Sequence, residues 1–387
     1  MTSGYDPRSA ETLTDPGPGW SALLRDDPVH YGDRFDPPFY TLSRHADVTD
    51  ALRDIETWSS EFGQGPRFTA PGGLLSDPPE HTRFRRIVQR AFTPSQIEKL
   101  RPRIEQIAHE LLDAASGETL ELHDDYACPL PVIVIAEVLG VPADDRGDFK
   151  RWSDVMVEAM GMEDPAPLMG DMVALGQYLA RAVAAHRASA RGGDLIDRLA
   201  AASEDGEGLE DAQIVGVVSQ LLVGGNETTT SLITNAVWRL LQDPERWEAV
   251  RANPSLVPAA LEESLRFDPP VLGLFRTTTR DVQIHGVTIP RRAKVMLSYA
   301  AANRDPRVFT EPDRFRLDRP AEEARQHLSF GHGIHFCLGA ALARLEAEIS
   351  LRVLLERRPR LALDGPGERI TPFFLWGRRR LPLRLGG

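Results

Sequence analysis

The segment Glu210–Leu241 limits the folds that this chain can adopt more than any other part of the sequence does. It has a nearly uninterrupted helical pattern, and apolar residues lie on most faces of the predicted helix. Such a helix is buried by the rest of the domain, because its apolar faces are more stable away from water. The segment therefore predicts a helical core built around one central helix.

Most of the chain outside this segment also predicts helices, and strands are few. The alternating, β-branched residues of Thr277–Tyr299 predict strands around a hairpin turn at His285-Gly286. Strands are also predicted at Phe39–Ser43 and within Leu361–Leu385. The other predicted helices cover residues 44–55, 81–90, 94–115, 126–139, 143–160, 165–190, 194–202, 244–252, 255–267 and 338–357.

Four segments rich in breakers or charge predict irregular structure: residues 1–38, the long loop 57–79, the acidic loop 203–208 and the charged segment 303–320. The fold class is therefore mainly α with a minor β lobe. We expect a single domain. Its helix-rich lobe would cover about 80–267 plus 330–357, and its β-rich lobe about 28–60, 268–329 and 358–387.

Composition restricts the partners and the compartment. The 387 residues include 42% hydrophobic ones, enough for a large core, and the formal net charge of −12 argues against nucleic acid as a partner. The two cysteines, Cys128 and Cys337, are too few for a disulfide framework, which favours a reducing, cytoplasmic setting. No signal peptide and no apolar segment of membrane-spanning length is present, so we expect no membrane partner.

The best place for chemistry is the stretch Phe330–Gly339, which leads into a predicted helix. Its three glycines permit tight turns, so backbone N–H groups can converge on the sulfur of Cys337. A sulfur at the start of a helix is favoured as a thiolate, which makes Cys337 a candidate metal ligand. Two alternatives stay open: a small buried hydrophobic residue, or a zinc site that Cys337 shares with His332 and His335.

A second candidate lies inside the central helix, at Gly224-Gly225-Asn226-Glu227-Thr228. Each glycine costs about 1 kcal/mol relative to alanine in a helix, so some function must offset the cost. Without side chains there, a flat ligand can lie against the helix, and Thr228 can hydrogen-bond to the carbonyl four residues earlier. Glu227 would be an acid in an apolar setting. The alternative is a notch for helix packing.

Two further sets of charged residues are candidates. Glu263 and Arg266 lie on one helical face, where Arg314 could join them, although most such pairs are surface ion pairs. His81 and Arg85 could present donors to one anionic group, and Arg276 and His335 could add to them. A solvated basic face is the alternative for the segment that contains His81.

Together these motifs resemble those of the cytochrome P-450 superfamily, the haem-thiolate monooxygenases, and specifically its soluble bacterial class. Phe330-Gly331-x-Gly333-x-His335-x-Cys337-x-Gly339 resembles the cysteine loop of that family. Glu263-x-x-Arg266 resembles its helix pair, and Gly224-Gly225-x-Glu227-Thr228 its oxygen-binding motif, with Gly224 where alanine is common. The order and the separations of the motifs match over nearly the whole chain.

The resemblance implies a triangular helical prism with a long central helix and small β sheets. It implies that Cys337 is the proximal ligand of haem b (protoporphyrin IX iron) within the loop marked by Phe330 and Gly339. Gly224 and Gly225 would make room for the macrocycle and O2, while Glu227 and Thr228 deliver protons. The residues implied to bind the haem propionates are His81, Arg85, Arg276 and His335. Glu263, Arg266 and Arg314 would form a structural network under the haem.

The resemblance also implies the reaction and the partners. One atom of O2 would enter an apolar small-molecule substrate by hydroxylation or epoxidation. Electrons would come from external NAD(P)H through a ferredoxin and its reductase, because the chain has neither a dinucleotide fingerprint nor the cysteines of an iron–sulfur cluster. We expect a monomer. The alternative is a haem-thiolate sensor or binding protein without turnover, which would not need Glu227 and Thr228.

Overall fold

The computed structural model describes residues 4–69, 72–115, 117–162, 166–188, 193–201, 203–204 and 207–386 of the chain. Contacts within the chain divide it into two compact units. The sheet unit is made of Met1–Pro78, Glu262–Cys337 and Phe373–Trp376. The helical unit is made of Pro79–Leu261, Leu338–Pro372 and Gly377–Gly387. The lobe boundaries expected from the sequence stay a prediction.

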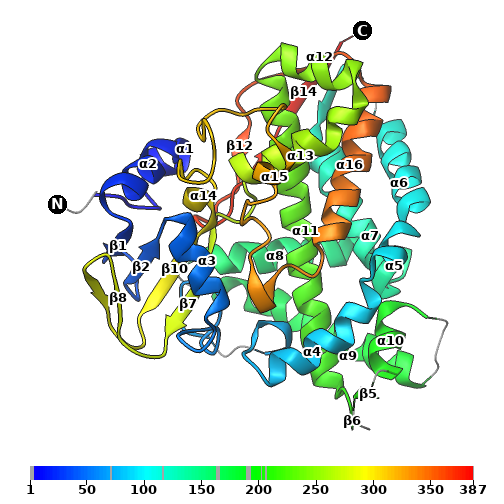
Figure 1. Cartoon of the computed structure of the whole chain (residues 1–387). Coiled ribbons are helices and arrows are strands. Elements are labelled where there is room, and N and C mark those ends of the chain that lie inside the picture. The colour runs from blue at the N-terminus through cyan, green and yellow to red at the C-terminus, as the bar shows by residue number, and fades with distance from the viewer. Residues whose placement is uncertain are drawn as a thin grey trace. The chain divides into compact units, whose positions relative to one another are not determined.

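The helical unit is built around α11 (Asp211–Leu241), which confirms the predicted central helix. α11 contacts α7 (Pro129–Leu139), α8 (Arg146–Gly161), α9 (Met169–Ala188) and α16 (Ala340–Arg357), as Figure 1 shows. Glu210 and Gln213 cap its first turn with reciprocal side-chain bonds to the backbone. Every residue from Thr229 to Val237 is buried, so apolar burial from all sides stabilises the helix.

Two predicted helices of this unit begin or break at prolines. The segment 94–115 forms α5 (Pro94–Glu98) and α6 (Arg101–Ala114), because Pro102 is accommodated in the first turn of a helix and not in its interior. The prediction of one continuous helix there is wrong. Likewise, the helix predicted from Tyr126 begins at Pro129, as α7, and follows a π-helical turn, η3 (Leu122–Ala127).

The remaining elements of the helical unit are short. Its other helices are α4 (Glu80–Val88), α10 (Leu195–Ala201) and α12 (Pro244–Ala252). A three-stranded antiparallel sheet has the order β11 (Leu361–Leu363), β14 (Pro382–Leu385), β4 (Thr119–Glu121). Two strand pairs complete the unit: β12 (Glu368–Arg369) with β13 (Arg378–Arg380), and β5 (Ser203–Glu204) with β6 (Glu207–Gly208) in the segment predicted as an acidic loop.

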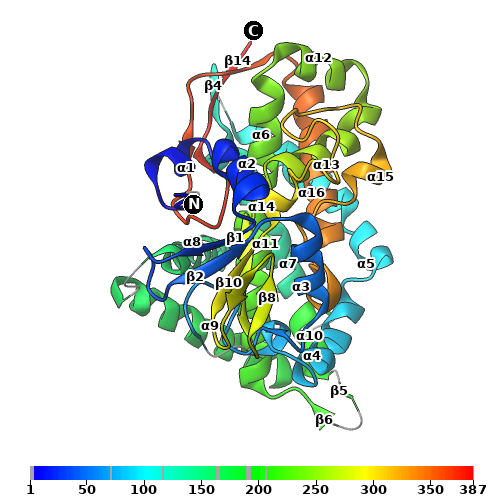
Figure 2. The same ribbon diagram turned by 60° about the vertical axis from the view of Figure 1, so that its left-hand side comes forward.

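The sheet unit contains a five-stranded sheet, several strands of which are visible in Figure 2. β10 pairs in parallel with β2 and in antiparallel with β7, while β1 and β3 are the edge strands. α3 (His45–Arg53) packs on the sheet with the buried Val48 and Leu52. In order across the sheet, the strands are β1 (Val29–Gly32), β2 (Phe39–Leu42), β10 (Lys294–Ser298), β7 (Gly273–Thr278) and β3 (Trp58–Ser59).

The predicted hairpin turn is confirmed between β8 (Val282–Ile284) and β9 (Val287–Ile289). His285 and Gly286 have φ values of 48° and 80°, the left-handed pair that matches the twist of a two-residue hairpin. The rest of the unit contains short helices, among them the end of α13 (Val257–Phe267), α14 (Tyr299–Ala302) and α15 (Ala321–Ala324).

The N-terminal segment is more regular than its prolines suggest. Residues 1–38 are predicted to be irregular, but they contain α1 (Ala10–Thr14), α2 (Gly17–Asp26) and β1. Pro16 and Pro18 lie at the start of α2. Backbone N–H groups there have no acceptor within the helix, so the N–H that proline lacks is not missed. Trp20 is buried, which holds the helix in the fold. Among the helices in the described ranges, none combines the length and the hydropathy that crossing a bilayer requires.

Candidate active site

Cys337 ends a closed turn in the sheet unit. Gly331 and Gly333 both have a φ of +70°, which residues with a Cβ rarely adopt. The Phe336 N–H donates to the Gly333 carbonyl (3.1 Å), and the Cys337 N–H donates to the Phe330 carbonyl (2.9 Å). Cys337 itself is exposed. The turn therefore fixes the backbone and leaves the thiol accessible to a ligand.

The same turn packs closely against α3. A Cβ on Gly333 would lie 2.5 Å from the carbonyl oxygen of Leu52, a distance that real Cβ atoms do not show. The positive φ and this close approach both require glycine at position 333. The glycine-rich loop is therefore rigid because α3 supports it, which the sequence pattern alone does not reveal.

The second cysteine has a different environment. Cys128 is buried in the helical unit at the start of α7. Burial raises the pKa of its thiol to about 12, so the thiol stays neutral at physiological pH. Of the two cysteines, only Cys337 has the exposure that a metal-ligating thiolate needs.

A buried ionic network lies behind the cysteine loop. Both oxygens of the Glu263 carboxylate are used: Arg266 Nη2 donates to Oε1 (2.8 Å) and Arg319 Nε donates to Oε2 (2.8 Å). All three side chains are almost completely buried. The predicted participation of the Arg314 side chain is wrong, because its guanidinium is 72% exposed and pairs with Glu311. Arg314 contributes its backbone carbonyl, which accepts from Arg266.

This network is connected to the loop through Asn303 and Ser329. Arg266 Nη1 donates to the Asn303 carbonyl (2.9 Å), and Asn303 Nδ2 donates to Ser329 Oγ (2.9 Å). Ser329 Oγ donates in turn to the Leu265 carbonyl (2.6 Å), and the Leu328 N–H donates to Asn303 Oδ1 (2.7 Å). The residues immediately before the cysteine loop are therefore fastened to α13. Nothing in the spacing of the sequence distinguishes Arg319, Asn303 or Ser329 from their neighbours.

The sheet unit also holds two of the predicted cationic residues. Arg276 lies on β7, where burial lowers the pKa of its guanidinium, and its Nη1 donates to the Phe275 carbonyl (2.8 Å). His335 lies inside the cysteine turn; its Nε2 is 3.4 Å from Ser60 Oγ, and its Nδ1 is 3.4 Å from Gln64 Nε2. A buried guanidinium is a suitable partner for a carboxylate group of a ligand.

The loop that follows β3 is held by an unexpected lysine. Lys294 on β10 is buried, and its Nζ donates to the carbonyls of Phe62 (2.7 Å) and Gly63 (2.9 Å). Burial lowers the pKa of Lys294 to about 8. Part of the breaker-rich loop 57–79 is therefore fixed by hydrogen bonds and is not simply irregular.

In the helical unit, the two glycines open one face of α11. A Cβ on Gly224 or Gly225 would meet no atom within 4 Å, although this helix is buried along much of its length. Thr228 Oγ1 donates to the Gly224 carbonyl (2.6 Å), which confirms the predicted bond to the residue four positions earlier. The alternative of a packing notch is not supported, because none of the residues that the structure describes fills the space beside the glycines.

Glu227 and Asn226 face different surroundings on the same turn of α11. Burial raises the pKa of Glu227, while Ser231 Oγ donates to Glu227 Oε1 (2.9 Å). A raised pKa favours the protonated carboxyl, which can act as a proton donor. Asn226, whose role the sequence does not indicate, is buried and donates to Ser153 Oγ on α8 (2.7 Å). It therefore joins two helices.

The other predicted residues of the helical unit lie on α4 and α16. His81 is buried and Arg85 is partly buried, one turn apart on α4. Gly339 is the N-cap of α16, which begins at Ala340, two residues later than predicted. In the sheet unit, Phe330 packs its ring against His327 and Phe336.

Comparisons with known proteins match this arrangement of motifs. Residues 166–358 match the family described as Cytochrome P-450. Erythromycin C-12 hydroxylase of Saccharopolyspora erythraea is 40% identical over 95% of this chain and 94% of that protein. Vitamin D(3) 25-hydroxylase of Pseudonocardia autotrophica is 40% identical over 100% of this chain and 97% of that protein. The chain belongs to the cytochrome P-450 family.

The fold of this P-450 agrees with a solved structure as well. Cytochrome P-450 CYP109Q5 from Chondromyces apiculatus has a TM-score of 0.90 and 38% sequence identity, over 99% of this chain and 98% of that one. The P-450 fold predicted from the motifs is therefore confirmed, and so is the class of enzyme, an O2-dependent oxidoreductase. Membership of the family implies a haem iron cofactor.

The residues of this P-450 fit such a cofactor in three respects. Cys337 offers an accessible sulfur on a rigid turn, and the glycines of α11 leave a face that a flat macrocycle can approach. The third respect is the set of hydrogen-bond donors. Propionate groups require cationic or imidazole side chains as partners, and four such side chains are buried or partly buried. They are Arg276 and His335 in the sheet unit, and His81 and Arg85 in the helical unit.

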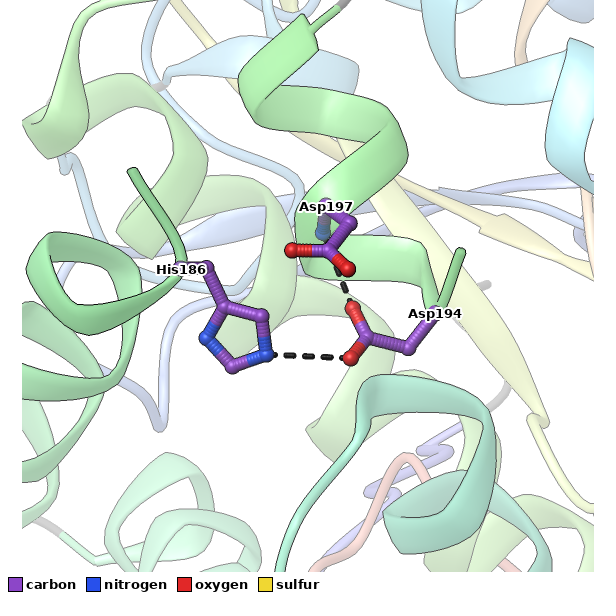
Figure 3. Close-up of side chains that lie close together, drawn as sticks. All are labelled: His186, Asp194 and Asp197. Carbon is purple, nitrogen blue, oxygen red and sulfur yellow. Dashed lines mark hydrogen bonds and ion pairs between the residues drawn. The ribbon is translucent and has the colours of Figure 1, made fainter. Parts of the chain in front are cut away.

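The zinc alternative is not supported. His332 Nε2 accepts a hydrogen bond from Arg53 Nε (3.0 Å), so this nitrogen does not bind a metal. Within the described ranges, the group of side chains close enough to share an ion is His186, Asp194 and Asp197, in the helical unit (Figure 3). There, His186 bonds to Asp194 (3.0 Å), and Asp194 caps the start of α10, so the group joins α9 to α10.

A cavity in the sheet unit is unsuited to an apolar substrate. Its volume is about 410 Å³, and it lies between α3 and β8. The carboxylates of Asp47, Asp50 and Asp54 and the charged pair Arg280 and Asp281 line much of it. Apolar ligands bind in pockets lined mainly by apolar and aromatic side chains, so this cavity is not a candidate for the substrate site.

The ionic network yields a prediction with a matched control. Arg319→Met leaves the buried Glu263 carboxylate with one cation fewer, which should lower the free energy of unfolding by about 3 to 5 kcal/mol. Arg314→Met, at an exposed position five residues earlier, should change it by less than about 0.5 kcal/mol. Urea unfolding of the two variants measures the difference. Similar losses in both variants would contradict the assignment of Arg319 to the network.

Proposed function

We propose that this P-450 inserts one atom of O2 into an apolar small-molecule substrate, with Cys337 as the thiolate ligand of haem b. The observation that carries the proposal is the acid–alcohol pair on the open face of α11. Thr228 is held on the Gly224 carbonyl, and Glu227, whose pKa is raised, lies beside it. A haem protein that only senses or binds would not need a proton donor at this position.

One set of side chains would bind the haem, and another would transfer protons. Arg276, His335, His81 and Arg85 would neutralise the propionates. The haem, when bound, supplies the iron chemistry that cleaves O2 and oxidises the substrate. Glu227 would supply protons, and the Thr228 hydroxyl would pass them on, because a hydroxyl both accepts and donates a hydrogen bond.

Hydroxylation of an apolar compound is the reaction that we favour over epoxidation. Two relatives are named for hydroxylating erythromycin and vitamin D(3). The proposed substrate walls are loop 57–79, Leu222–Thr228 of α11, Val271–Leu274 and the pair Phe373-Phe374. Aliphatic and aromatic side chains dominate Val271–Leu274 and Phe373-Phe374, and the α11 segment begins with Leu222 and Val223, which suits an apolar ligand.

Electrons would reach the haem from NAD(P)H through a ferredoxin and its reductase. The sequence contains neither a dinucleotide fingerprint nor an iron–sulfur cysteine set, so both functions would reside in partners. We further propose that the protein works as a monomer in the cytoplasm, where its two cysteines would stay reduced.

The acid–alcohol pair can be tested directly. In Thr228→Ala, electrons should still be consumed, but less product and more hydrogen peroxide should form, because proton delivery is impaired. We expect the product formed per NAD(P)H to fall by roughly tenfold or more. Thr234→Ala, a buried threonine of the same helix, is the control. Unchanged coupling in Thr228→Ala would contradict the relay, and a wild-type protein without any turnover would favour the sensor.

The proposed ferredoxin site is a set of arginines in the helical unit. Arg86 on α4 and Arg90 in the short helical turn Gln89–Ala91 that follows it are exposed, and Arg83 and Arg344 are partly exposed. A basic patch on an otherwise acidic protein can attract an acidic partner and speed its association.

Charge reversal tests this docking surface. The double variant Arg86→Glu/Arg90→Glu should slow reduction by a ferredoxin at low salt by about tenfold or more, and high salt should reduce the difference, because screening weakens exposed charges. Arg360→Glu, an exposed arginine elsewhere in the unit, should have little effect. Stopped-flow reduction measures the rates. Equal rates in the double variant and the wild type at every salt concentration would exclude this surface.

A further inference from the structure

Three side chains of the helical unit, none of them among the residues proposed to bind haem, lie close enough to share one metal ion. His186 lies in the last turn of α9, Asp194 immediately precedes α10, and Asp197 lies in the first turn of α10. One nitrogen or oxygen atom of each lies within 4.8 Å of the other two, and Figure 3 shows the side chains together. The His186 and Asp194 side chains are 10% and 19% exposed, and Asp197 is buried.

The ring of His186 is oriented by the backbone. Its Nδ1 is 2.7 Å from the Ala182 carbonyl oxygen, and its Nε2 is 3.0 Å from Asp194 Oδ2. A carbonyl oxygen only accepts hydrogen bonds, so Nδ1 carries the proton of that bond. Histidines that bind metals donate in this way to a backbone carbonyl or a carboxylate, which directs the other ring nitrogen at the metal. The Nε2 atom therefore has the position of a metal ligand.

The contact between His186 Nε2 and Asp194 Oδ2 requires a cation. In a neutral ring with its proton on Nδ1, Nε2 is an acceptor, and a carboxylate oxygen is an acceptor too. Two acceptors 3.0 Å apart repel each other unless a second ring proton or a metal ion interacts with both. Two atoms bound to one Zn²⁺ at about 2.1 Å, at a right angle, are separated by about 3 Å. The distance therefore fits both a proton and a metal ion.

Backbone N–H groups hold both carboxylates. The Asp197 N–H donates to Asp194 Oδ1 (2.9 Å), while Oδ2 of the same carboxylate faces His186. The Gly193 N–H donates to Asp197 Oδ2 (3.1 Å). Carboxylates that bind metals are themselves held by such hydrogen bonds. Each of the three side chains therefore has a backbone partner that orients it.

The charges around Asp194 favour a metal ion over the proton. A Cβ on Gly140, the C-cap of α7, would lie 2.3 Å from Asp194 Oδ2, so this carboxylate packs against the C-terminal end of α7. Such an end carries a partial negative charge, and His186 lies at the same end of α9. Within this group, an imidazolium supplies one positive charge for two carboxylates, whereas a divalent ion supplies two.

We propose that His186, Asp194 and Asp197 bind a divalent transition-metal ion of the Zn²⁺ class, which fastens the end of α9 to the start of α10. Water would complete the coordination. An imidazole ligand selects such an ion over Mg²⁺ and Ca²⁺, which prefer oxygen ligands only. The site is distinct from the zinc alternative at Cys337, and its role is structural, so it does not rest on the proposed reaction.

Zn²⁺ binding to the haem-containing protein, stripped of other metals with a chelator, tests the site by calorimetry. The wild type should bind one equivalent, and His186→Gln and Asp197→Asn should each weaken that binding by at least tenfold, because each removes a ligand. His123→Gln is the matched control: His123 is also 10% exposed and lies 2.8 Å from an aspartate, but it belongs to η3 and not to the group in Figure 3. It should bind Zn²⁺ like the wild type.

Thermal unfolding, followed by circular dichroism, gives a second readout. Zn²⁺ at a hundredfold excess over its Kd should raise the unfolding midpoint of the wild type and of His123→Gln, but not that of His186→Gln. Mg²⁺ at the same concentration should not raise it. If His186→Gln does not fold, Asp197→Asn decides the question.

Two outcomes would overturn the proposal. A wild type that neither binds Zn²⁺ nor is stabilised by it would show that His186 and Asp194 form only a protonated ion pair. Equal Zn²⁺ affinity in the wild type, His186→Gln and Asp197→Asn would show an adventitious ion only, bound elsewhere on the surface.

Discussion

The cysteine loop depends on a carboxylate that two guanidinium groups share. Glu263 is buried on α13 and pairs with Arg266 and Arg319, and Arg319 also pairs with Glu323, so the charges in the interior are balanced. Through Asn303 and Ser329, this network holds the chain immediately before Phe330. A metal ligand is effective only where its backbone is fixed, and this interaction provides the fixed point.

The central helix makes the complementary contribution within the helical unit. Burial along most of α11 stabilises it enough to tolerate two adjacent glycines, which cost about 1 kcal/mol each. The open face beside them carries Thr228 and Glu227, and Asn226 and Ser231 on the same turns hold neighbouring groups in place. The buried turns on both sides of the glycines thus support a polar turn in the middle of the helix.

Much of this arrangement is predictable from the sequence, because the deciding signals are local. The apolar pattern of residues 210–241 predicts the core helix, and His285-Gly286 predicts the hairpin. Some errors are local, such as the break between α5 and α6, and others concern contacts between segments distant in sequence. Arg319 replaces the predicted Arg314 because only the fold shows which arginine is buried. Gly377 belongs to no motif, since only the fold shows that its backbone packs closely against Ser231 of α11.

We propose that the sulfur of Cys337 is the ligand of the haem iron. The absorption spectrum of the reduced protein with carbon monoxide tests it most directly, because the position of the band depends on the ligand opposite carbon monoxide. We expect the band of thiolate-ligated haem, and we expect Cys337→His to replace it with the band of histidine-ligated haem. A wild-type band typical of neutral histidine ligation, or protein that binds no haem, would contradict the claim.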